Sequence, residues 1–456
     1  MANTKLMTIK TKRRPLLLSR RFAPLYVLFE AGTFNDNALK NALIALITYV
    51  AVINPAFEFL PGLPEAMKVP IASLIFTGPF LIFCAIAGQV ADKIDRGIIF
   101  RWIKRAELGI MIFAGIGFMT QSIWILAISL GLMGTQSAFF APTKNAVMPQ
   151  WLDSDELIRG NGLLSGTQFA VLLVGTIVGL ELATEHPLLL AFILFVLAIV
   201  GWIAAETCPP AAAPNPDLKV DYNPITAIWS VLKKIFEHPG VLRPWLGIAW
   251  FYGLSTVFIT AFPNFIANVM GYEKDVLQIV LVVSTISIFI GSMLTMVVGN
   301  WKIWGPEAIR LVAAGIIGVA LTTLILYFAP SPKYLGTENF GPVSEFLKDP
   351  HTPLFLAAVS GASLFNGMFV VPLQAMAQRR AHPRIRAQLM SAGSVLYNFA
   401  VNILTFGLIG LALMNMPPKA PFLMIVIGSA FVAAYAIWRC FHMENRKAYI
   451  GDRFAD

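Results

Sequence analysis

Long apolar runs separated by short polar segments occupy most of the chain from residue 22 onwards. In a bilayer, unpaired backbone groups cost several kcal/mol each, so spanning segments are helices of about 20 residues or strands of a closed barrel. Runs such as Ile110 to Gly134 indicate helices. The pattern predicts twelve of them, at residues 22–53, 70–92, 98–120, 122–148, 158–184, 186–206, 243–269, 276–300, 305–329, 352–380, 386–415 and 420–442.

The composition agrees with this pattern. Of the 456 residues, 57% are hydrophobic and 13% are charged, with a mean hydropathy of +0.71, whereas soluble proteins have roughly a quarter charged residues. The predicted fold class is therefore an all-α integral membrane protein. The net charge of +9 does not indicate nucleic-acid binding, because the basic residues form short clusters between apolar runs. Cys84, Cys208 and Cys440 lie far apart, so no disulfide framework, metal site or other cofactor is expected.

The distribution of basic residues predicts the topology. With both ends cytoplasmic, most of the 34 Lys and Arg residues fall in cytoplasmic segments and helix ends, as membrane proteins prefer. Lys40 and Lys144 lie within spans, and five lysines lie on the opposite side, namely Lys68, Lys274, Lys333, Lys348 and Lys419. The predicted organisation is a basic cytoplasmic N-terminus at 1–21, a six-helix half at 22–207, a cytoplasmic linker at 208–242, a second half at 243–442 and a cytoplasmic tail at 443–456.

The linker and an internal repeat refine this organisation. After the Pro- and Ala-rich stretch Pro209 to Pro216, apolar residues recur at helical spacing with Lys233 and Lys234 on the polar side, which predicts a helix lying on the membrane surface. Phe139 to Pro142 is repeated by Phe369 to Pro372, and Gly166 by Gly393, at offsets of 230 and 227 residues. Two similar six-helix halves are typical of the major facilitator architecture, in which substrate binds between the halves.

The first predicted helix carries the clearest candidate site. A charge at the bilayer centre costs roughly 2.5 to 3.5 kcal/mol on insertion scales, so charged side chains there should face a cavity. At about 100° per residue, one arc of roughly 140° holds the polar residues between positions 30 and 41 except Asn35: Glu30, Thr33, Asp36, Asn37, Lys40 and Asn41. Alternatively, Asp36 and Lys40 neutralise each other, and the asparagines bond to neighbouring helices.

A second group of polar residues supplements this stripe. Lys144 and Asn145 follow Pro142, which loosens the local backbone, although Lys144 fits a snorkelling lysine equally well. Glu30, Asp36, Lys40 and Lys144 have no net charge, which suits a zwitterionic headgroup. Asn264 lies 228 residues after Asp36, near the repeat offset, so the second half offers a neutral partner. The candidate substrate-binding residues are Glu30, Asp36, Asn37, Lys40, Asn41, Lys144, Asn145 and Asn264.

The loop from Gly88 to Gly97, between the second and third predicted helices, holds candidate gating residues. It has a glycine for close packing and a carboxylate able to meet a helix N-terminus. It resembles the signature GxxxD(R/K) loop of major facilitator proteins, which implies that Gly88, Asp92 and Arg96 latch one conformation. A plain solvated turn is the alternative. The latch is expected to be one-sided, because the corresponding segment Gly299 to Gly305 lacks an aspartate.

Several short segments, in their order along the chain, resemble the bacterial lysophospholipid transporter family of the major facilitator superfamily. They are Asn35 to Leu39, Gly88 to Asp92, Ala141 to Lys144, Asn161 to Leu163 and Phe369 to Ala375. The resemblance implies import of lysophospholipids such as lysophosphatidylethanolamine across the bacterial inner membrane, for reacylation on the cytoplasmic side. It also implies an acyltransferase/acyl-ACP synthetase as working partner.

Two other functions remain open from the sequence. Glu30 and Asp36 are membrane carboxylates that suit a proton-coupled exporter of amphipathic drugs or another small solute. A membrane enzyme is not expected, because no histidine has an aspartate five residues on, as an HxxxxD acyltransferase requires, and no Gly-Lys pair exists for a phosphate loop. A sensor that does not transport remains an alternative.

Overall fold

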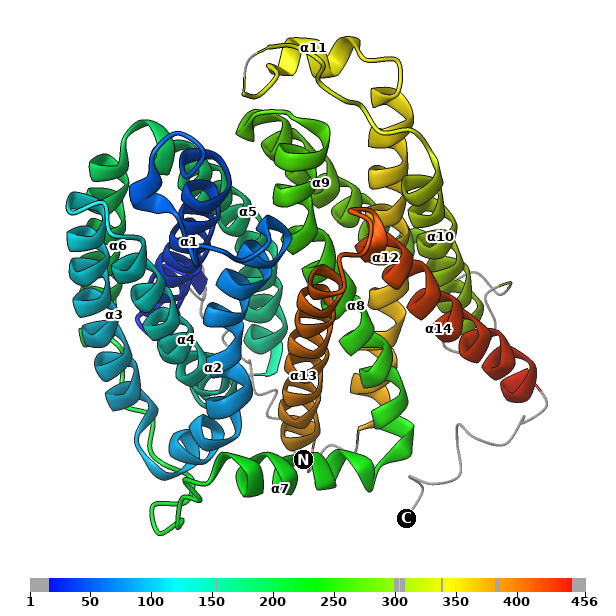
Figure 1. Ribbon diagram of the computed structural model, residues 1–456. Coiled ribbons are helices and arrows are strands. Elements are labelled where there is room, and N and C mark those ends of the chain that lie inside the picture. The colour runs from blue at the N-terminus through cyan, green and yellow to red at the C-terminus, as the bar shows by residue number, and fades with distance from the viewer. Residues whose placement is uncertain are drawn as a thin grey trace, which may run out of the picture.

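The computed structural model describes residues 16–152, 154–298, 303, 308–337, 339–381 and 386–444, and these are almost entirely helical (Figure 1). The first six long helices are α1 (Ala23–Ala45), α2 (Glu65–Lys93), α3 (Arg96–Met119), α4 (Ile123–Trp151), α5 (Ser154–Glu185) and α6 (Pro187–Glu206). A shorter α7 (Pro224–Phe236) precedes α8 (Pro239–Asn264), α9 (Lys274–Val298) and α10 (Ile309–Phe328). The chain continues through the short α11 (Val343–Lys348) to α12 (Thr352–Arg380), α13 (Arg386–Leu413) and α14 (Ala420–Glu444).

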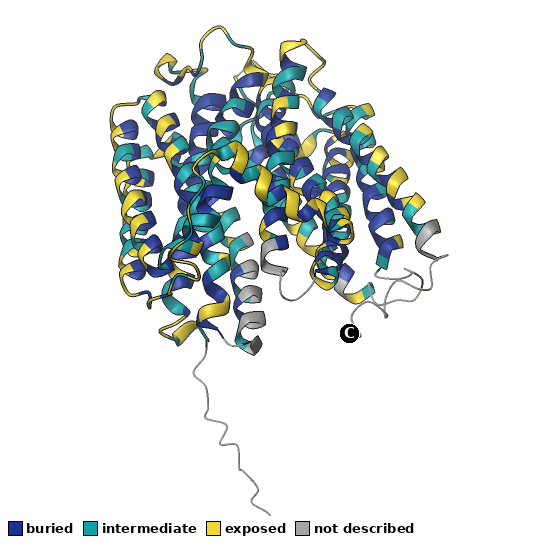
Figure 2. Cartoon of the chain, turned by 90° about the horizontal axis from the view of Figure 1, so that it is seen from below, coloured by how far each residue is buried: buried dark blue, intermediate teal, exposed yellow. Residues whose placement is uncertain are grey.

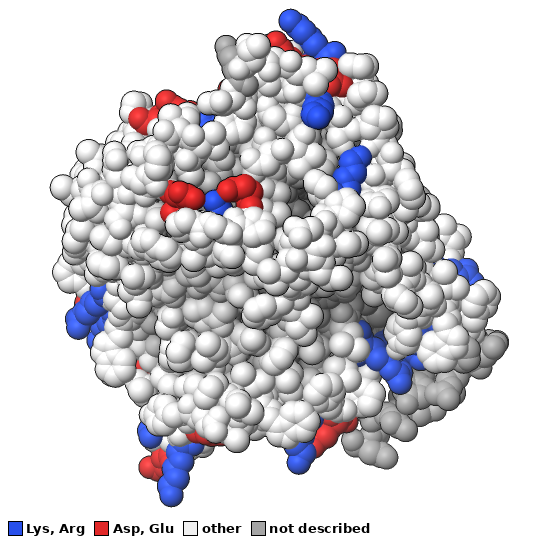
Figure 3. All heavy atoms as spheres, in the orientation of Figure 1, with Lys and Arg blue, Asp and Glu red and all other residues white. Residues whose placement is uncertain are grey.

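Each predicted helical range is occupied by a helix of at least 20 residues. Within the described part of the chain, nine of these helices are long and apolar enough to cross a membrane: α2, α4, α6, α8, α9, α10, α12, α13 and α14. Outside this group, α1 carries Glu30, Asp36 and Lys40 along its length. Figure 3 shows a broad uncharged surface across the middle of the visible face, as lipid contact requires. The chain is therefore a multi-pass membrane protein.

Prolines and capping side chains set where many helices begin. Proline lies in the first turn of α1, α6, α7, α8 and α12, where its missing N–H would have no partner in any case. Asp95 accepts hydrogen bonds from the N–H groups of Gly97 and Ile98 and so caps α3. Asn223 caps α7 in the same manner, through the N–H of Ile225.

The long helices form two six-helix halves, α1 to α6 on one side and α8, α9, α10, α12, α13 and α14 on the other (Figure 1). The halves repeat details of each other. Both α1 and α8 end in a π-helical turn, at Leu46–Val50 and Phe265–Met270, and both α4 and α12 contain an internal proline, Pro142 and Pro372. Between the halves, α2 packs against α13 and α8, and α5 packs against α9.

The connection between the halves is α7, which runs along one end of the molecule (Figure 1). Its Ala227, Leu232 and Ile235 are buried, and it packs against α2, α8 and α13. Ile225 and Trp229 are exposed, together with Lys233 and Lys234. The predicted apolar face of this helix is therefore divided, because one part packs on the protein and another part stays free.

The two halves meet tightly at the end opposite α7. One buried apolar cluster contains residues of α1 and of α8, among them Leu43 and Phe262, and the rings of Tyr49 and Phe340 lie 5.4 Å apart. At the α7 end, the cluster around Phe22 and Trp151 belongs to the first half and its adjoining linker. Figure 2, seen from the α7 end, shows buried positions facing neighbouring helices and exposed ones on the outer faces. The halves are thus joined at the end away from α7.

Candidate functional site

The candidate site begins with α1, which is pressed closely against α5. A side chain at Gly175 would lie 2.9 Å from the carbonyl oxygen of Phe34, and one at Gly179 would collide with the backbone of Ala38. Two glycines one turn apart thus allow the two helix backbones to approach. This contact fixes the rotation of α1 and hence the direction of its polar stripe.

Asp36 is the central carboxylate of the stripe. The hydroxyl of Ser137 on α4 lies 2.9 Å from each of its carboxylate oxygens. Asp36 and Lys40 form no ion pair within 4 Å among the described residues, although they lie one turn apart. Instead the Lys40 ammonium lies 5.9 Å from the centre of the Phe76 ring on α2. Asp36 therefore keeps lone pairs, and Lys40 keeps N–H donors, that no other charged side chain uses.

Asn37 and Asn41 bond mainly within their own helix. The Asn37 amide donates to the carbonyl of Thr33 at 2.8 Å, and the Asn41 amide donates to the carbonyl of Asn37 at 2.8 Å. Asn41 also donates to the hydroxyl of Thr176 on α5 at 3.1 Å. The alternative of bonding to a neighbouring helix therefore describes Asn41, whereas the Asn37 amide bonds within α1.

Glu30 and Lys144 form a second charged region on the α7 side of Asp36. One Glu30 oxygen accepts a hydrogen bond from Thr167 on α5 at 2.5 Å, and the other is buried without a partner in the described structure. The Lys144 ammonium lies 4.0 Å from the centre of the Phe29 ring and makes no ion pair within 4 Å there. An acceptor and a cation are therefore held near each other without being neutralised by direct contact.

The two remaining candidates lie apart from these groups. Asn145 is exposed on α4, next to Lys144. Asn264, at the end of α8, accepts a hydrogen bond from Asn268 at 2.9 Å. Among the described residues, no hydrogen bond joins the Asn264 side chain to the α1 stripe.

Sequence reasoning missed a buried ion pair behind α1. On α3, Lys104 and Glu107 are 1% and 0% exposed, and their charged atoms lie 2.5 Å apart. Lys104 lies inside the first half, next to Gly32 of α1, Phe140 of α4 and Gly201 of α6. Asn35, predicted to face away from the stripe, donates to Glu107 at 3.0 Å and to the carbonyl of Leu194 on α6 at 3.2 Å. The one available signal in the sequence was the three-residue spacing of these opposite charges.

The predicted loop from Gly88 to Gly97 is mostly helical, because α2 continues to Lys93 and α3 begins at Arg96. The junction of these two helices contacts the linker. Arg96 pairs with Asp92 at 3.3 Å, and the backbones of Asp92 and Arg96 bond to those of Asn215 and Ala211. The expected close packing at Gly88 is not observed, since a side chain there would meet nothing within 4 Å. The tight position is Gly97, where a side chain would lie 2.9 Å from the carbonyl oxygen of Pro209. The corresponding segment Gly299 to Gly305 lies, except for Ile303, outside the described residues.

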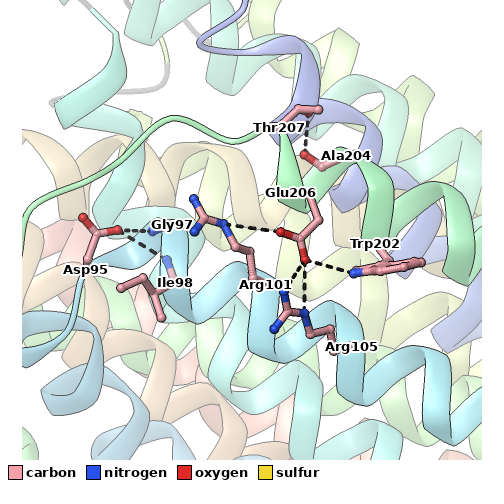
Figure 4. Close-up of polar contacts among 9 residues, drawn as sticks. All are labelled: Asp95, Gly97, Ile98, Arg101, Arg105, Trp202, Ala204, Glu206 and Thr207. Carbon is pink, nitrogen blue, oxygen red and sulfur yellow. Dashed lines mark hydrogen bonds and ion pairs between the residues drawn. The ribbon is translucent and has the colours of Figure 1, made fainter.

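The capping carboxylate of this loop is Asp95 (Figure 4). Its second oxygen accepts a hydrogen bond from the N–H of Ala211 in the linker at 3.0 Å. Nearby, Glu206 at the end of α6 accepts hydrogen bonds from Arg105 at 2.7 Å and Trp202 at 3.0 Å (Figure 4). The loop, α3, α6 and the linker therefore form one polar assembly at the α7 end.

Two six-helix halves with charged side chains at membrane depth define a membrane transporter. The sequence model of the Major Facilitator Superfamily matches residues 41–337, and the chain belongs to that superfamily. Its relatives include the lysophospholipid transporter LplT of Enterobacter sp. (strain 638), which is 24% identical over 413 residues, 89% of this chain and 91% of the relative. LplT of Klebsiella pneumoniae (strain ATCC 700721 / MGH 78578) is 24% identical over 438 residues, 94% of this chain and 97% of the relative.

Solved structures support the fold alone. An auto-inhibited POT family peptide transporter superposes with a TM-score of 0.62 over 95% of this chain and 99% of its own, at 10% identity. The POT family transporter PepTSo gives 0.57 over 92% and 98%, at 13% identity. The predicted major facilitator fold is therefore confirmed.

Proposed function

We propose that this protein transports lysophospholipids, such as lysophosphatidylethanolamine, across the bacterial inner membrane by alternating access. Relatives that cover 89% and 94% of the chain are named lysophospholipid transporters. The observation that carries the proposal is the set of charges on α1 and α4. Among the described residues, none of Glu30, Asp36, Lys40 and Lys144 is ion-paired with another charge within 4 Å.

These unpaired charges suit a zwitterionic headgroup. A carboxylate that accepts one hydroxyl hydrogen bond, as Asp36 does, has lone pairs left for an ammonium group. Lysine is a common phosphate ligand because its ammonium offers three donors, and both Lys40 and Lys144 have donors available. In this proposal the carboxylates receive the ammonium, the lysines receive the phosphate, and Asn37, Asn41, Asn145 and Asn264 line the path.

The remaining parts of the proposal concern topology and partners. The termini and the linker at 208–242 lie in the cytoplasm, α7 rests on the inner leaflet, and the halves at 22–207 and 243–442 rock about the site. Gly88, Asp92 and Arg96 belong to the gating loop, which works through its bonds to the linker. The imported lipid is reacylated by an acyltransferase/acyl-ACP synthetase, and the chain itself is no enzyme.

Uptake of radiolabelled lysophosphatidylethanolamine into proteoliposomes tests this function. We expect faster accumulation in vesicles that contain the protein than in protein-free vesicles of the same lipid. Equal uptake rates in the two kinds of vesicle would refute the proposal. A second set of vesicles with an imposed proton gradient separates this function from proton-coupled export, which would require a flux of protons dependent on substrate.

A further inference from the structure

The buried pair Lys104–Glu107 has no part in the function proposed so far. Removing two charges from water is expensive, and their attraction compensates only when further hydrogen bonds satisfy both groups. Both side chains are almost completely buried, on a helix that carries none of the candidate binding residues. A pair in this position needs an explanation.

The space for Lys104 is formed by glycines on two other helices. A side chain at Gly32 on α1 would lie 2.7 Å from the Lys104 ammonium, and one at Gly201 on α6 would lie 3.4 Å from its stem. The ring of Phe140 on α4 lies 5.5 Å from the ammonium. Lys104 therefore reaches the backbone of α1 one turn before Asp36.

Glu107 connects α1, α3 and α4. One of its oxygens accepts a hydrogen bond from the amide of Asn35 at 3.0 Å. The other accepts from the ammonium of Lys104 and from the amide of Gln136 at 3.1 Å. An ionised carboxylate only accepts hydrogen bonds, so Gln136 must turn its NH₂ group towards Glu107.

In this orientation the Gln136 carbonyl oxygen faces Ser137, the residue that contacts Asp36. That oxygen lies 3.0 Å from the hydroxyl of Ser137, which also contacts Asp36. Because Asn35 precedes Asp36 and Gln136 precedes Ser137, the contacts close into a ring that runs through two stretches of backbone. Ser137 has one hydroxyl hydrogen, for which Asp36 and Gln136 compete.

We propose that Gln136 and Glu107 are positioning residues for Asp36, with the Lys104–Glu107 pair as their fixed anchor. The ring holds the Asp36 carboxylate in one place, and the competition for the Ser137 hydrogen leaves part of the carboxylate free for a substrate ammonium. This inference rests on the proposed function for its substrate, a headgroup with a primary amine. The arrangement itself is a property of the protein without substrate.

The variant Gln136→Met tests the inference at nearly constant side-chain volume. Without the competing oxygen, Ser137 donates to Asp36 alone, and the route from the carboxylate to Glu107 through Gln136 is lost, while the route through Asn35 remains. We expect the KM for lysophosphatidylethanolamine to rise about tenfold, equivalent to about 1.4 kcal/mol, with a maximal rate within about twofold of wild type. Gln150→Met, the same change at an exposed position of α4, should alter neither constant.

A purely structural role for Gln136 would lower the maximal rate and leave KM unchanged. Either this result or wild-type values for both constants would overturn the inference. The double variant Lys104→Met/Glu107→Gln is a second test. It is expected to fold, because it leaves no buried charge unpaired. It should raise KM in the same direction, and an unchanged KM in this folded variant also contradicts the inference.

An infrared measurement without substrate keeps this inference separate from the proposed function. The band of the Asp36 carboxylate is identified by its loss in Asp36→Asn. It should shift in Gln136→Met and stay in place in Gln150→Met. An unshifted band would refute the positioning role even if lysophospholipid is transported, and a shifted band would support it even if the substrate is different.

Discussion

At the scale of single residues, the position of the Lys144 ammonium distinguishes a lysine of the binding site from a snorkelling lysine. Its ammonium lies 4.0 Å from the centre of the ring of Phe29, the residue before Glu30. A snorkelling lysine would direct its charge to the membrane surface and use only its stem within the protein. The observed contact with an aromatic ring on α1 instead holds the charge beside the polar stripe.

Replacing Lys144 by methionine should therefore reduce uptake of lysophosphatidylethanolamine at least tenfold. The variant loses a charged hydrogen bond to the phosphate, and such bonds contribute about 1.5 to 3 kcal/mol. Lys144→Arg should retain part of the activity, because the charge remains. Lys348→Met, which removes an exposed lysine at the other end of the molecule, is the control. Wild-type uptake by Lys144→Met would show that this lysine only snorkels.

The polar stripe on α1 could be identified from the sequence, whereas the residues on other helices that contact it could not. Charges in an apolar helix are costly, so Glu30, Asp36 and Lys40 stand out in the sequence without any knowledge of the fold. Ser137 and Gln136 give no such signal, because hydroxyls and amides are common in membrane helices. Which helix faces α1 is decided by packing between segments about 100 residues apart, which periodicity does not encode.

At the scale of elements, the close contact between α1 and α5 supports the site. Gly179→Ala would place a methyl group against the backbone of Ala38, and overpacking of this kind costs about 1 to 3 kcal/mol. We expect a lower unfolding temperature in detergent and slower uptake, since α1 must move or rotate. Gly109→Ala on α3 meets nothing within 4 Å and is the matched control. Equal unfolding temperatures for the two variants would contradict this close approach of α1 and α5.

The positions of the long helices were predictable, whereas some ends and faces were not. Runs of about 20 apolar residues leave the chain little choice but to form helices in lipid. However, α2 begins at Glu65, five residues before the predicted start, and the buried Lys68 in its first turn pairs with Glu65 at 2.5 Å. The division of the α7 face likewise depends on contacts with α2 and α13.

At the scale of the whole molecule, ion pairs join the halves at the end opposite α7. The ammonium of Lys274 on α9 lies 2.6 Å from Glu185 and 3.5 Å from Glu181, both on α5. The glutamine Gln278 donates to Glu181 at 3.1 Å. In the proposed alternating access the halves separate at this end in one state, which would require these contacts to break.

The pH dependence of this closure follows from Glu185. Its hydrogen bond to Lys274, and then the charge of Lys274, lower its pKa below the ordinary value of 4.5 while the end is closed. When the end opens, the pKa returns to that value. The contribution to closure is thus complete above about pH 4.5 and is lost as the pH falls through the lowered pKa.

Spin labels on opposite halves, at Ile53 and Leu335, measure this opening, because both positions are exposed at the same end. We expect the population with long distances to grow as the pH falls below about 4.5. Glu185→Gln should reduce this dependence and raise the open population at neutral pH. The effect is small, since exposed ion pairs contribute only about 0 to 1 kcal/mol. An identical pH response in wild type and Glu185→Gln would exclude this pair as a latch.

In the proposed function, Asp36 binds the headgroup of a transported lysophospholipid inside the membrane. The most direct measurement compares initial rates of lysophosphatidylethanolamine uptake into proteoliposomes for wild type, Asp36→Asn and Asp217→Asn, an exposed control in the linker. We predict that wild type and Asp217→Asn transport equally, and that Asp36→Asn, reconstituted in equal amount, falls to the rate of protein-free vesicles. Undiminished transport by Asp36→Asn would contradict the account.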